Sequence, residues 1–258
     1  MPRNYIKPVL GISFLILAFF VSVGFEKKSS NATHFPLETP AIEVGEVYLK
    51  HSGYAFVYNE THEQAKWVAY CLTKKETQGS YERSDHFVED PMVKTGTAAN
   101  ADYSKSGFDR GHLAPAADMK WSELAMDESF YYSNMSPQLP SFNRGIWKKL
   151  EEQVRDWAIS LDSVLIVTGP ILGESLPSIG ANKVSVPKFY YKAILDFKGE
   201  HSKAIAFVLP NQGSKAPLMS FAITIDALEK LTGMNFFYQL EDHLEQSVEA
   251  MTCQTCWP

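Results

Sequence analysis

Apolar residues gather in five short runs separated by polar segments, which indicates a chain built largely around strands. The first two are rich in aromatic and β-branched residues and flank a short polar stretch, so they predict a hairpin. The third is a continuous apolar segment that closes on Gly-Pro, typical of a buried strand. The last two flank Lys198-Gly199 and predict a further strand pair. The runs span residues 54–58, 67–72, 164–170, 189–195 and 204–210.

A helical period replaces this pattern over residues 143–161. Apolar residues recur there at three- and four-residue spacing, which predicts an amphipathic helix, and they are Ile146, Leu150, Val154, Trp157 and Leu161. A neighbouring stripe at steps of four carries Asn143, Trp147, Glu151 and Arg155. An amide, a carboxylate and a guanidinium should thus project from one side of a helix whose other side is core. Alone, Glu151 and Arg155 would be an ordinary surface ion pair.

The remaining segments complete an α+β reading. Residues 74–106 are polar and predict a loop-rich region, and residues 221–231 predict a helix or a strand that leads into a helix. Residues 26–45 are mostly polar, contain two prolines and read as a linker. With no internal repeat after them, residues 46–258 are expected to form a single domain.

The N-terminal segment, residues 1–25, has the pattern of an export signal. Arg3 and Lys7 precede an uncharged, mostly apolar run over residues 8–25. This order is typical of a signal peptide or a signal anchor, whereas a mitochondrial presequence would be Arg-rich and amphipathic. We therefore expect an exported protein, secreted or periplasmic, or held at the membrane through this segment.

Composition narrows the choice of partners. The content of 45% hydrophobic and 21% charged residues is ordinary for a globular protein, and the net charge is -6. An acidic chain is not held on nucleic acid by bulk electrostatics, so any such contact must be local. The three cysteines are too few for a disulfide scaffold. In an exported protein, Cys253 and Cys256 are expected to form a local disulfide, with Cys71 as a competitor.

The chemistry of the chain concentrates in the tetrapeptide Asp109–His112. Histidine titrates near neutral pH and is the default general base, while an adjacent arginine suits a phosphate. Glycine lets the backbone turn sharply or approach another group closely. A turn around a core histidine is the alternative explanation of these four residues alone.

The surrounding motifs resemble the DNA/RNA non-specific endonuclease family. The resemblance runs from residues 109–116 through residues 133–138 to Asn143 and Leu150-Glu151, and it spans roughly Tyr54 to Tyr238. These ββα-metal (His-Me finger) nucleases include mitochondrial endonuclease G and secreted bacterial sugar-non-specific nucleases. The resemblance implies an α+β fold with a central antiparallel sheet and flanking helices.

Roles for individual residues follow from this resemblance. It implies that His112 is the general base and that Asn143 is the single protein ligand of a divalent metal. Glu151 would hold metal-bound water, and Asn134 would help to position the site. Phosphate would be bound by three arginines, namely Arg83, Arg110 and Arg155.

The resemblance also implies the reaction. It is metal-dependent hydrolysis of phosphodiester bonds in DNA and RNA, without sequence preference and with 5′-phosphate products. An amide oxygen with waters suits Mg²⁺ or Mn²⁺. Activity should then fall on acidification through the histidine range. Two alternatives are a phosphodiesterase for nucleotides or small esters on the same scaffold, and a binding module that has lost activity. Many family members form homodimers, and the sequence leaves that open for this chain.

The basic residues needed for such a substrate are scattered along the sequence. Between residues 101 and 160 there are seven Lys or Arg against nine Asp or Glu, so no linear basic patch exists. Folding would have to bring the cations into one groove, and the candidates are Lys105, Arg110, Arg144, Lys148, Lys149 and Arg155.

Overall fold

The structure, a computed structural model, describes Met1 and residues 36–258. The predicted signal segment therefore lies outside the described residues, apart from Met1. Among the described residues, no helix is both long and apolar enough to cross a membrane.

An antiparallel sheet forms the centre of the domain. In the described part of the chain it has seven strands in the order β1-β2-β3-β6-β9-β10-β11, and every neighbouring pair is antiparallel. The strands are β1 (Tyr48–Lys50), β2 (Ala55–Asn59), β3 (Gln64–Thr73), β6 (Ser163–Pro170), β9 (Phe189–Asp196), β10 (Lys203–Pro210) and β11 (Ala222–Ile223). All five predicted strands and the predicted hairpin of β2 with β3 are confirmed.

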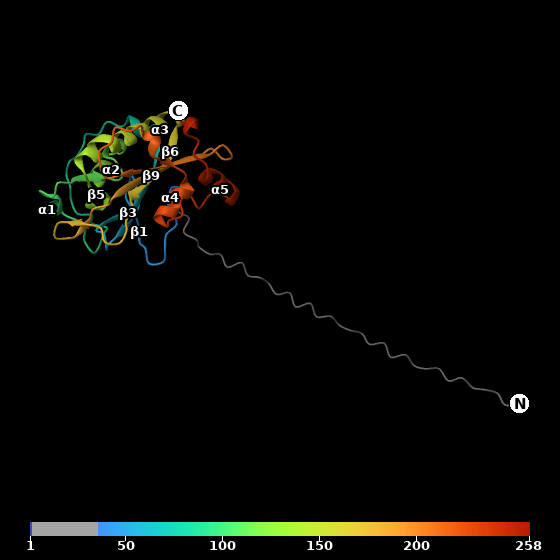
Figure 1. The fold of residues 1–258 in the computed structure, drawn as a ribbon, viewed down its shortest axis with the longest axis horizontal. Helices are drawn as coiled ribbons and strands as arrows, with labels where there is room; N and C mark the ends of the chain where they lie inside the picture. The colour runs from blue at the N-terminus through green and yellow to red at the C-terminus, as the bar shows by residue number, and fades with distance from the viewer. Residues whose placement is uncertain (2–35) are drawn as a thin grey trace. The chain divides into compact units, whose positions relative to one another are not determined.

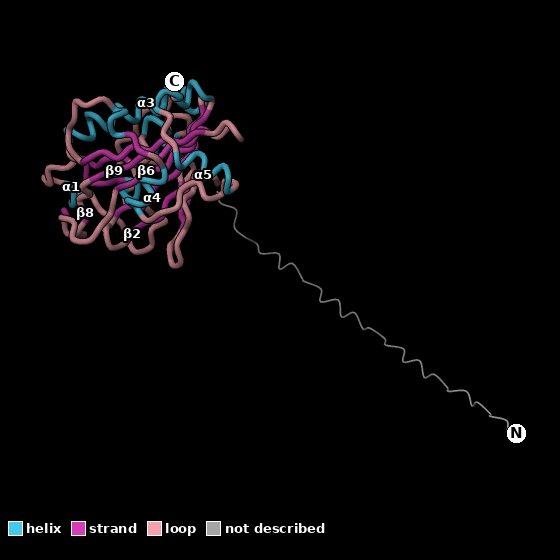
Figure 2. The backbone as a smooth tube through the Cα atoms, turned by 45° about the vertical axis from the view of Figure 1, so that its right-hand side comes forward, coloured by secondary structure: helices cyan, strands magenta, loops and turns pink. Residues whose placement is uncertain are grey.

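Side chains alternate between the two faces of this sheet and build a core on each. Along β2, Phe56 packs into one core and Val57 into the other, and Val68 and Trp67 divide in the same way on β3. Both faces are covered, so the central strands read as nearly continuous apolar runs. Figure 2 shows β6 and β9 between α3 on one side and α4 on the other.

The helices belong to different faces of the sheet (Figure 1). Helix α3 (Lys148–Leu161) buries Leu150, Val154 and Trp157 in the first core, as the predicted apolar stripe requires. Helices α4 (Ile225–Thr232) and α5 (Asp242–Ala250) pack into the second core. The predicted strand-to-helix element at residues 221–231 is β11 followed by α4.

A small two-stranded sheet precedes α3 and carries the Asp109–His112 tetrapeptide. Strand β4 (Asp109–His112) pairs antiparallel with β5 (Met135–Gln138), and the turns that lead into α3 follow. This is the ββα order that the resemblance implies. The other short elements are α1 (Asn100–Tyr103), α2 (Glu123–Glu128), β7 (Ser178–Ile179) and β8 (Val184–Ser185).

The boundaries of the domain differ from the sequence prediction. The compact unit includes the described residues 36–45 as well as residues 46–258, so the second half of the predicted linker belongs to it. Thr39 is buried, and Leu37 and Ile42 pack against the second core. The Ala41 amide donates to the Asn235 carbonyl at 2.9 Å. The prolines and polar residues of this segment predicted a linker. The sequence did not show its packing, because its contacts are with residues far away along the chain and leave no local pattern.

The C-terminal cysteines pair as predicted. Cys253 and Cys256 form a disulfide, while Cys71 is free and exposed on β3. The end of the chain packs on α3, where the Trp157 indole donates to the Pro258 carbonyl at 3.0 Å and its ring lies 4.5 Å from the Trp257 ring.

Candidate active site

One cavity of about 360 Å³ brings together six of the seven residues that the sequence singles out for chemistry. It lies where β4 meets the start of α3. Its lining comprises Arg83, Arg110, His112, Pro115, Ala116, Ala117, Asn143, Arg144, Lys148, Glu151 and Arg155. Only Asn134, of the seven, does not line it.

The pairing of β4 with β5 fixes the position of the tetrapeptide. Gly111 lies opposite Ser136, and a Cβ atom there would come within 2.2 Å of the Gln138 side chain. The sequence suggested that Gly111 allows a sharp turn, but Gly111 lies within strand β4. The structure shows that it is required because the Gln138 side chain passes directly over the backbone.

His112 is held between aromatic rings at the floor of the cavity. Its imidazole meets the Phe130 ring edge-on with centroids 4.9 Å apart, and Phe87 lies 5.9 Å away. The Nε2 atom is buried and has no hydrogen-bond partner among the described residues. A buried polar atom without a partner is uncommon, and His112 lines the cavity, so a molecule bound there can supply the missing partner. The ring is thus placed to accept a proton.

Burial and positive neighbours keep this imidazole neutral. Burial first, and then the charges of Arg83 and Arg110, lower the pKa of His112 to about 3. Cationic neighbours disfavour an imidazolium, so the neutral ring predominates through the physiological range. The sequence placed its protonation in the ordinary histidine range, and the structure moves it to lower pH.

Asn143 is oriented by Asp109, a role that the sequence did not reveal. The Asn143 amide nitrogen Nδ2 donates to Asp109 Oδ2 at 2.9 Å. An ionised carboxylate only accepts hydrogen bonds, so this contact fixes the amide orientation and leaves Asn143 Oδ1 available to another partner. Arg144 holds the same carboxylate through bonds of 2.8 and 2.6 Å, and these contacts lower the pKa of Asp109.

The segment that carries Asn143 is not the first turn of a regular α-helix. Residues Phe142–Trp147 form a π-helical turn, and Gly145 within it has non-helical angles of φ -110° and ψ -111°. The simple helical stripe from Asn143 to Arg155 is therefore interrupted, and Trp147 is buried. Single π turns are frequent at functional sites. The kink still leaves Asn143 and Glu151 on the same cavity.

Arg155 faces the cavity with one side and a buried carboxylate with the other. Its Nη1 donates to Asp118 Oδ1 at 2.8 Å, and the Tyr70 hydroxyl donates to Asp118 Oδ2 at 2.8 Å. Asp118 is 1% exposed, so this ion pair is protected from solvent and positions the guanidinium. The sequence did not single out Asp118 because the pair joins residues 37 apart.

A buried cation, Lys192, lies behind Glu151. Lys192 comes from β9, is fully buried, and its Nζ lies 5.1 Å from the centroid of the Trp147 ring. Burial raises the pKa of Glu151, which Lys192 opposes, and burial lowers the pKa of Lys192. The two charges therefore favour each other's ionised form in a region that disfavours charge. A lysine in an otherwise apolar strand was the only sequence signal for this contact.

The two remaining arginines stack on aromatic rings at the rim. The Arg110 guanidinium lies 4.0 Å from the centroid of Phe87, and its Nη1 donates to Asn100 Oδ1 at 2.7 Å. Arg83 lies 4.7 Å from the centroid of Phe130 and pairs with Asp85 at 2.5 Å. These contacts hold both cations over the rings that also hold His112.

Asn134 acts through the backbone. It is fully buried, and its Oδ1 accepts from the Ala114 amide at 2.8 Å while its Nδ2 donates to the Ala114 and Ser129 carbonyls. These bonds fix the chain two residues after His112. Asn134 therefore contacts the backbone next to the cavity and does not line it.

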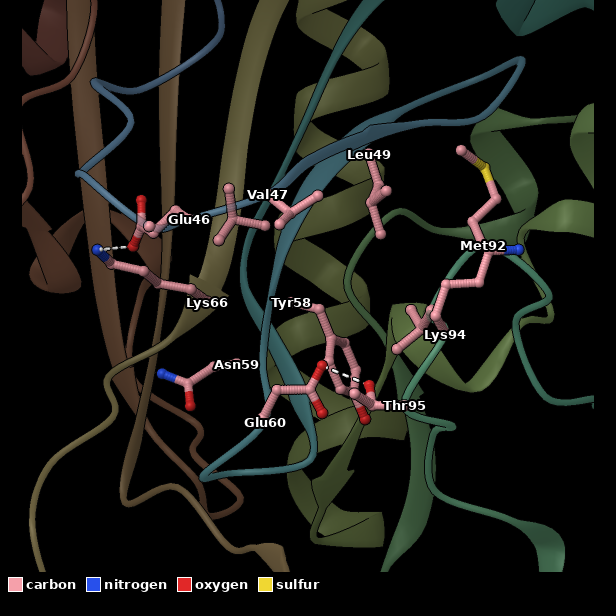
Figure 3. A pocket seen from close by; sticks show the side chains of 13 residues that line it. Glu46, Val47, Leu49, Tyr58, Asn59, Glu60, Lys66, Met92, Lys94 and Thr95 are labelled. Atoms are coloured by element: carbon pink, nitrogen blue, oxygen red, sulfur yellow. Dashed lines mark hydrogen bonds and ion pairs between the residues drawn. The ribbon is translucent and has the colours of Figure 1, made fainter.

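A second cavity, of about 390 Å³, lies by β1 and β2 (Figure 3). In it, Lys66 contacts Glu46 at 2.6 Å and Thr95 donates to Glu60 at 2.6 Å. None of the residues predicted to carry chemistry lines it. The cavity at His112 is the better candidate for a reaction.

The known proteins that this chain resembles are nucleases. A family model described as DNA/RNA non-specific endonuclease matches residues 31–243. The chain is 37% identical to nuclease C1 of Cunninghamella echinulata var. echinulata over 80% of this chain and 89% of that protein. It is 36% identical to human mitochondrial endonuclease G, over 71% of this chain and 67% of that protein. A crystal structure of the EndoG/EndoGI complex superposes with a TM-score of 0.72 at 31% identity, covering 80% of this chain and 90% of that one.

Proposed function

Because the chain belongs to the DNA/RNA non-specific endonuclease family, we propose that it hydrolyses phosphodiester bonds of both DNA and RNA at the His112 cavity. One observation carries this assignment. In a chain of net charge -6, five basic side chains line a single cavity together with His112 and Asn143. They are Arg83, Arg110, Arg144, Lys148 and Arg155. Four of them are among the six cations expected to gather there, whereas Lys105 and Lys149 are not in the lining.

The donor set fits a hard divalent cation, which family membership requires. Asn143 offers Oδ1 because Asp109 occupies its amide nitrogen, and Glu151 lines the same cavity with a carboxylate. Amide and carboxylate oxygens are the ligands of Mg²⁺ or Mn²⁺, whereas zinc prefers histidine and cysteine. Asn143 would hold the ion and Glu151 its waters. When bound, such an ion supplies Lewis-acid stabilisation at the scissile phosphate.

The neutral His112 supplies the base. Its unpartnered Nε2 would accept the proton of a water molecule as the water attacks phosphorus. The bond from phosphorus to the 3′-oxygen breaks, and the leaving oxygen takes up a proton from solvent. The products carry a 5′-phosphate and a 3′-hydroxyl. The two aromatic rings around His112 hold the imidazole in place, so little reorganisation accompanies proton transfer.

The cations act on the phosphate backbone. Arg110 and Arg155 would offset the negative charge that builds on the phosphoryl oxygens, and the stacked Arg83 would extend this field along the rim. Arg144 and Lys148 would contact neighbouring phosphates of a polymer. Contacts to phosphates carry no base information, so cleavage without sequence preference follows.

A comparison of substrates tests this proposal. Wild-type protein should cut long DNA and long RNA with catalytic efficiencies far above that for a small aryl phosphodiester, because only a polymer engages the rim cations. Efficient cleavage of the small ester with little cutting of either polymer would instead support the phosphodiesterase alternative.

The imidazole of His112 should remain neutral at mildly acidic pH. Its lowered pKa means that the ring stays deprotonated at pH 5, where an exposed histidine is largely protonated. The unfolded chain binds this proton first, so the stability from this group falls as pH drops from about 6.5 toward the folded pKa. An NMR titration of the metal-free protein checks the value. A midpoint near 6.5 for His112 would contradict the account.

Removing the carboxylate of Asp109 should weaken metal dependence. The Asp109→Ala substitution frees the amide of Asn143 to rotate, and loss of such a supporting contact typically costs about 10–100-fold in metal affinity or activity. The Mg²⁺ concentration for half-maximal activity should therefore rise by that factor. Asp109→Asn is the matched control, because its amide oxygen can still accept from Asn143 and its effect should be smaller. Equal Mg²⁺ requirements in wild type and Asp109→Ala would refute the role.

We also propose export as the location. The basic and apolar pattern of residues 1–25 and the Cys253–Cys256 disulfide support it, since disulfides persist in oxidising compartments. The homodimer and the N-terminal membrane anchor stay predictions.

A further inference from the structure

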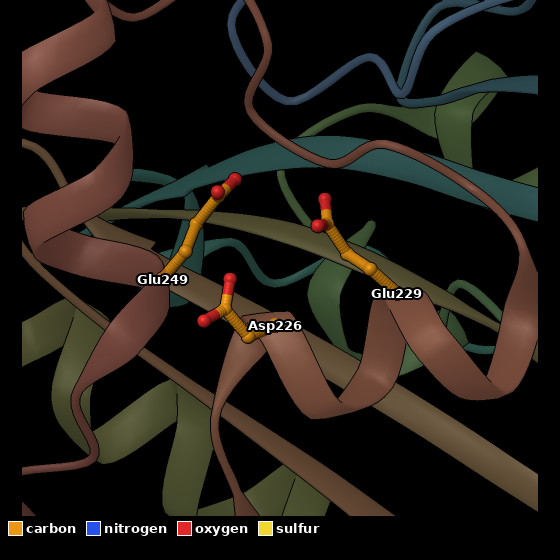
Figure 4. Close-up of side chains that lie close together, drawn as sticks. All are labelled: Asp226, Glu229 and Glu249. Atoms are coloured by element: carbon orange, nitrogen blue, oxygen red, sulfur yellow. The ribbon is translucent and has the colours of Figure 1, made fainter.

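Three carboxylates from α4 and α5 face one another on the side of the sheet opposite α3 (Figure 4). Asp226 and Glu229 lie one turn apart on α4, and Glu249 comes from the last turn of α5. One carboxylate oxygen of each lies within 4.8 Å of the other two. No residue that lines the His112 cavity belongs to this group.

The buried faces of α4 and α5 place these three side chains next to one another. Thr224 caps α4 by accepting from the Ala227 amide at 3.0 Å, and Ile225 and Leu228 are buried in the second core. With that face of α4 buried, Asp226 and Glu229 at a spacing of three share a neighbouring side. On α5, Leu244 and Val248 are likewise buried and bring Glu249 beside α4.

One oxygen of the buried Glu249 carboxylate has no hydrogen-bond partner among the described residues. This oxygen is Oε1, and Glu249 is only 7% exposed. No lysine, arginine or histidine of the described chain forms an ion pair with any of the three carboxylates. Glu229 Oε1 accepts a hydrogen bond from the Phe236 amide at 2.8 Å, which offsets little of the negative charge of the three carboxylates.

Electrostatics near Glu249 is unfavourable in three ways. The residue is buried, it lies beside Asp226 and Glu229, and it occupies the C-terminal end of a helix, where the dipole favours cations. Burial first, and then Glu229, Glu245 and Asp226, raise the pKa of Glu249 to about 8. A bound cation would remove each of these penalties at once.

We propose that Asp226, Glu229 and Glu249 form a second cation site, structural rather than catalytic, that takes Ca²⁺. Oxygen ligands bind Ca²⁺ at about 2.3–2.6 Å, so ligands on opposite sides of one ion lie roughly 4.6–5.2 Å apart. The three oxygens all lie within 4.8 Å of one another, so no pair is too far apart to share one ion. Waters would complete the 6–8 ligands, and the absence of cysteine and histidine from the trio disfavours zinc. The ion would join α4 to α5 and fasten the C-terminal region to the sheet.

Thermal unfolding of the full chain tests the site. The measurement uses the Asn143→Ala background, so that ion binding at the proposed catalytic site does not contribute. At pH 7.5, millimolar CaCl₂ should raise Tm by about 5–10 °C relative to chelated protein, as ligand binding to the folded state requires. Calorimetric titration with CaCl₂ should give one site per chain.

Matched variants assign the site to these residues. Asp226→Asn and Glu249→Gln each remove one charge without removing volume, so both should fold and should lose most of the rise in Tm. Glu241→Gln, at an exposed position at the start of α5, should keep it. If Tm did not change with Ca²⁺, the repulsion among the three carboxylates would be reduced by a bound proton and not by a metal, and the proposal would be overturned. An undiminished rise in both Asp226→Asn and Glu249→Gln would overturn it equally.

Discussion

Replacement of His112 with alanine is expected to lower the turnover of DNA and RNA by about 10²–10⁴-fold, the usual contribution of a general base. The structure gives the physical reason, because His112 is the only histidine among the residues that line the cavity. Its burial and its cationic neighbours keep the ring unprotonated and therefore able to accept a proton. Initial rates of plasmid and RNA digestion at saturating Mg²⁺ would measure the loss.

Two controls separate chemistry from folding in this variant. Circular dichroism and Tm should show a folded protein, because the substitution removes a ring nitrogen that already lacks a partner. Added imidazole should restore part of the activity by entering the space between Phe87 and Phe130. Undiminished cutting by a folded His112→Ala protein would refute the role of the base.

Replacement of Asn143 with alanine should abolish most metal-dependent activity. A bound cation contributes several kcal/mol of charge stabilisation, and each 1.36 kcal/mol is tenfold in rate, so the loss should reach roughly 10²-fold or more. The alanine also leaves Asp109 without the amide that it orients, although Arg144 still pairs with it. Rates measured across a Mg²⁺ titration would show whether excess metal recovers activity.

Lys149→Ala is the matched control for Asn143→Ala. Lys149 is an exposed residue near the start of α3 that does not line the cavity, so its removal should leave the Mg²⁺ dependence unchanged. If Asn143→Ala kept the Mg²⁺ dependence of the wild type, the metal would have to be held elsewhere.

Local patterns predicted most of the fold. Continuous apolar runs and runs rich in aromatic and β-branched residues identified five strands, because their side chains are divided between two buried faces of one sheet. The helical period of Leu150, Val154 and Trp157 predicted α3, because these three side chains lie on one side of the helix and pack into the first core. The kink at Gly145 escaped prediction, since a single glycine within a helical pattern does not specify a π turn. The ordered segment before residue 46 escaped it because its partners lie near the other end of the chain.

The sequence likewise predicted some residues of the candidate site and missed others. His112, Asn143 and Glu151 were identified because the motifs that contain them resemble a known family, and the structure places them on one cavity. The residues that support them come from elsewhere in the sequence. Asp109 meets Asn143 from 34 residues away, and Asp118 meets Arg155 from 37 residues away. Such pairs have no sequence period, so only the folded chain reveals them.

Metal dependence of cleavage by the wild-type protein tests the central claim most directly. Plasmid DNA and a long RNA would each be incubated with the protein in Mg²⁺, in EDTA, and in EDTA followed by excess Mg²⁺. We expect both polymers to be cut in Mg²⁺, neither in EDTA, and both again once Mg²⁺ is restored. Cutting that continues undiminished in EDTA would contradict a metal-dependent nuclease.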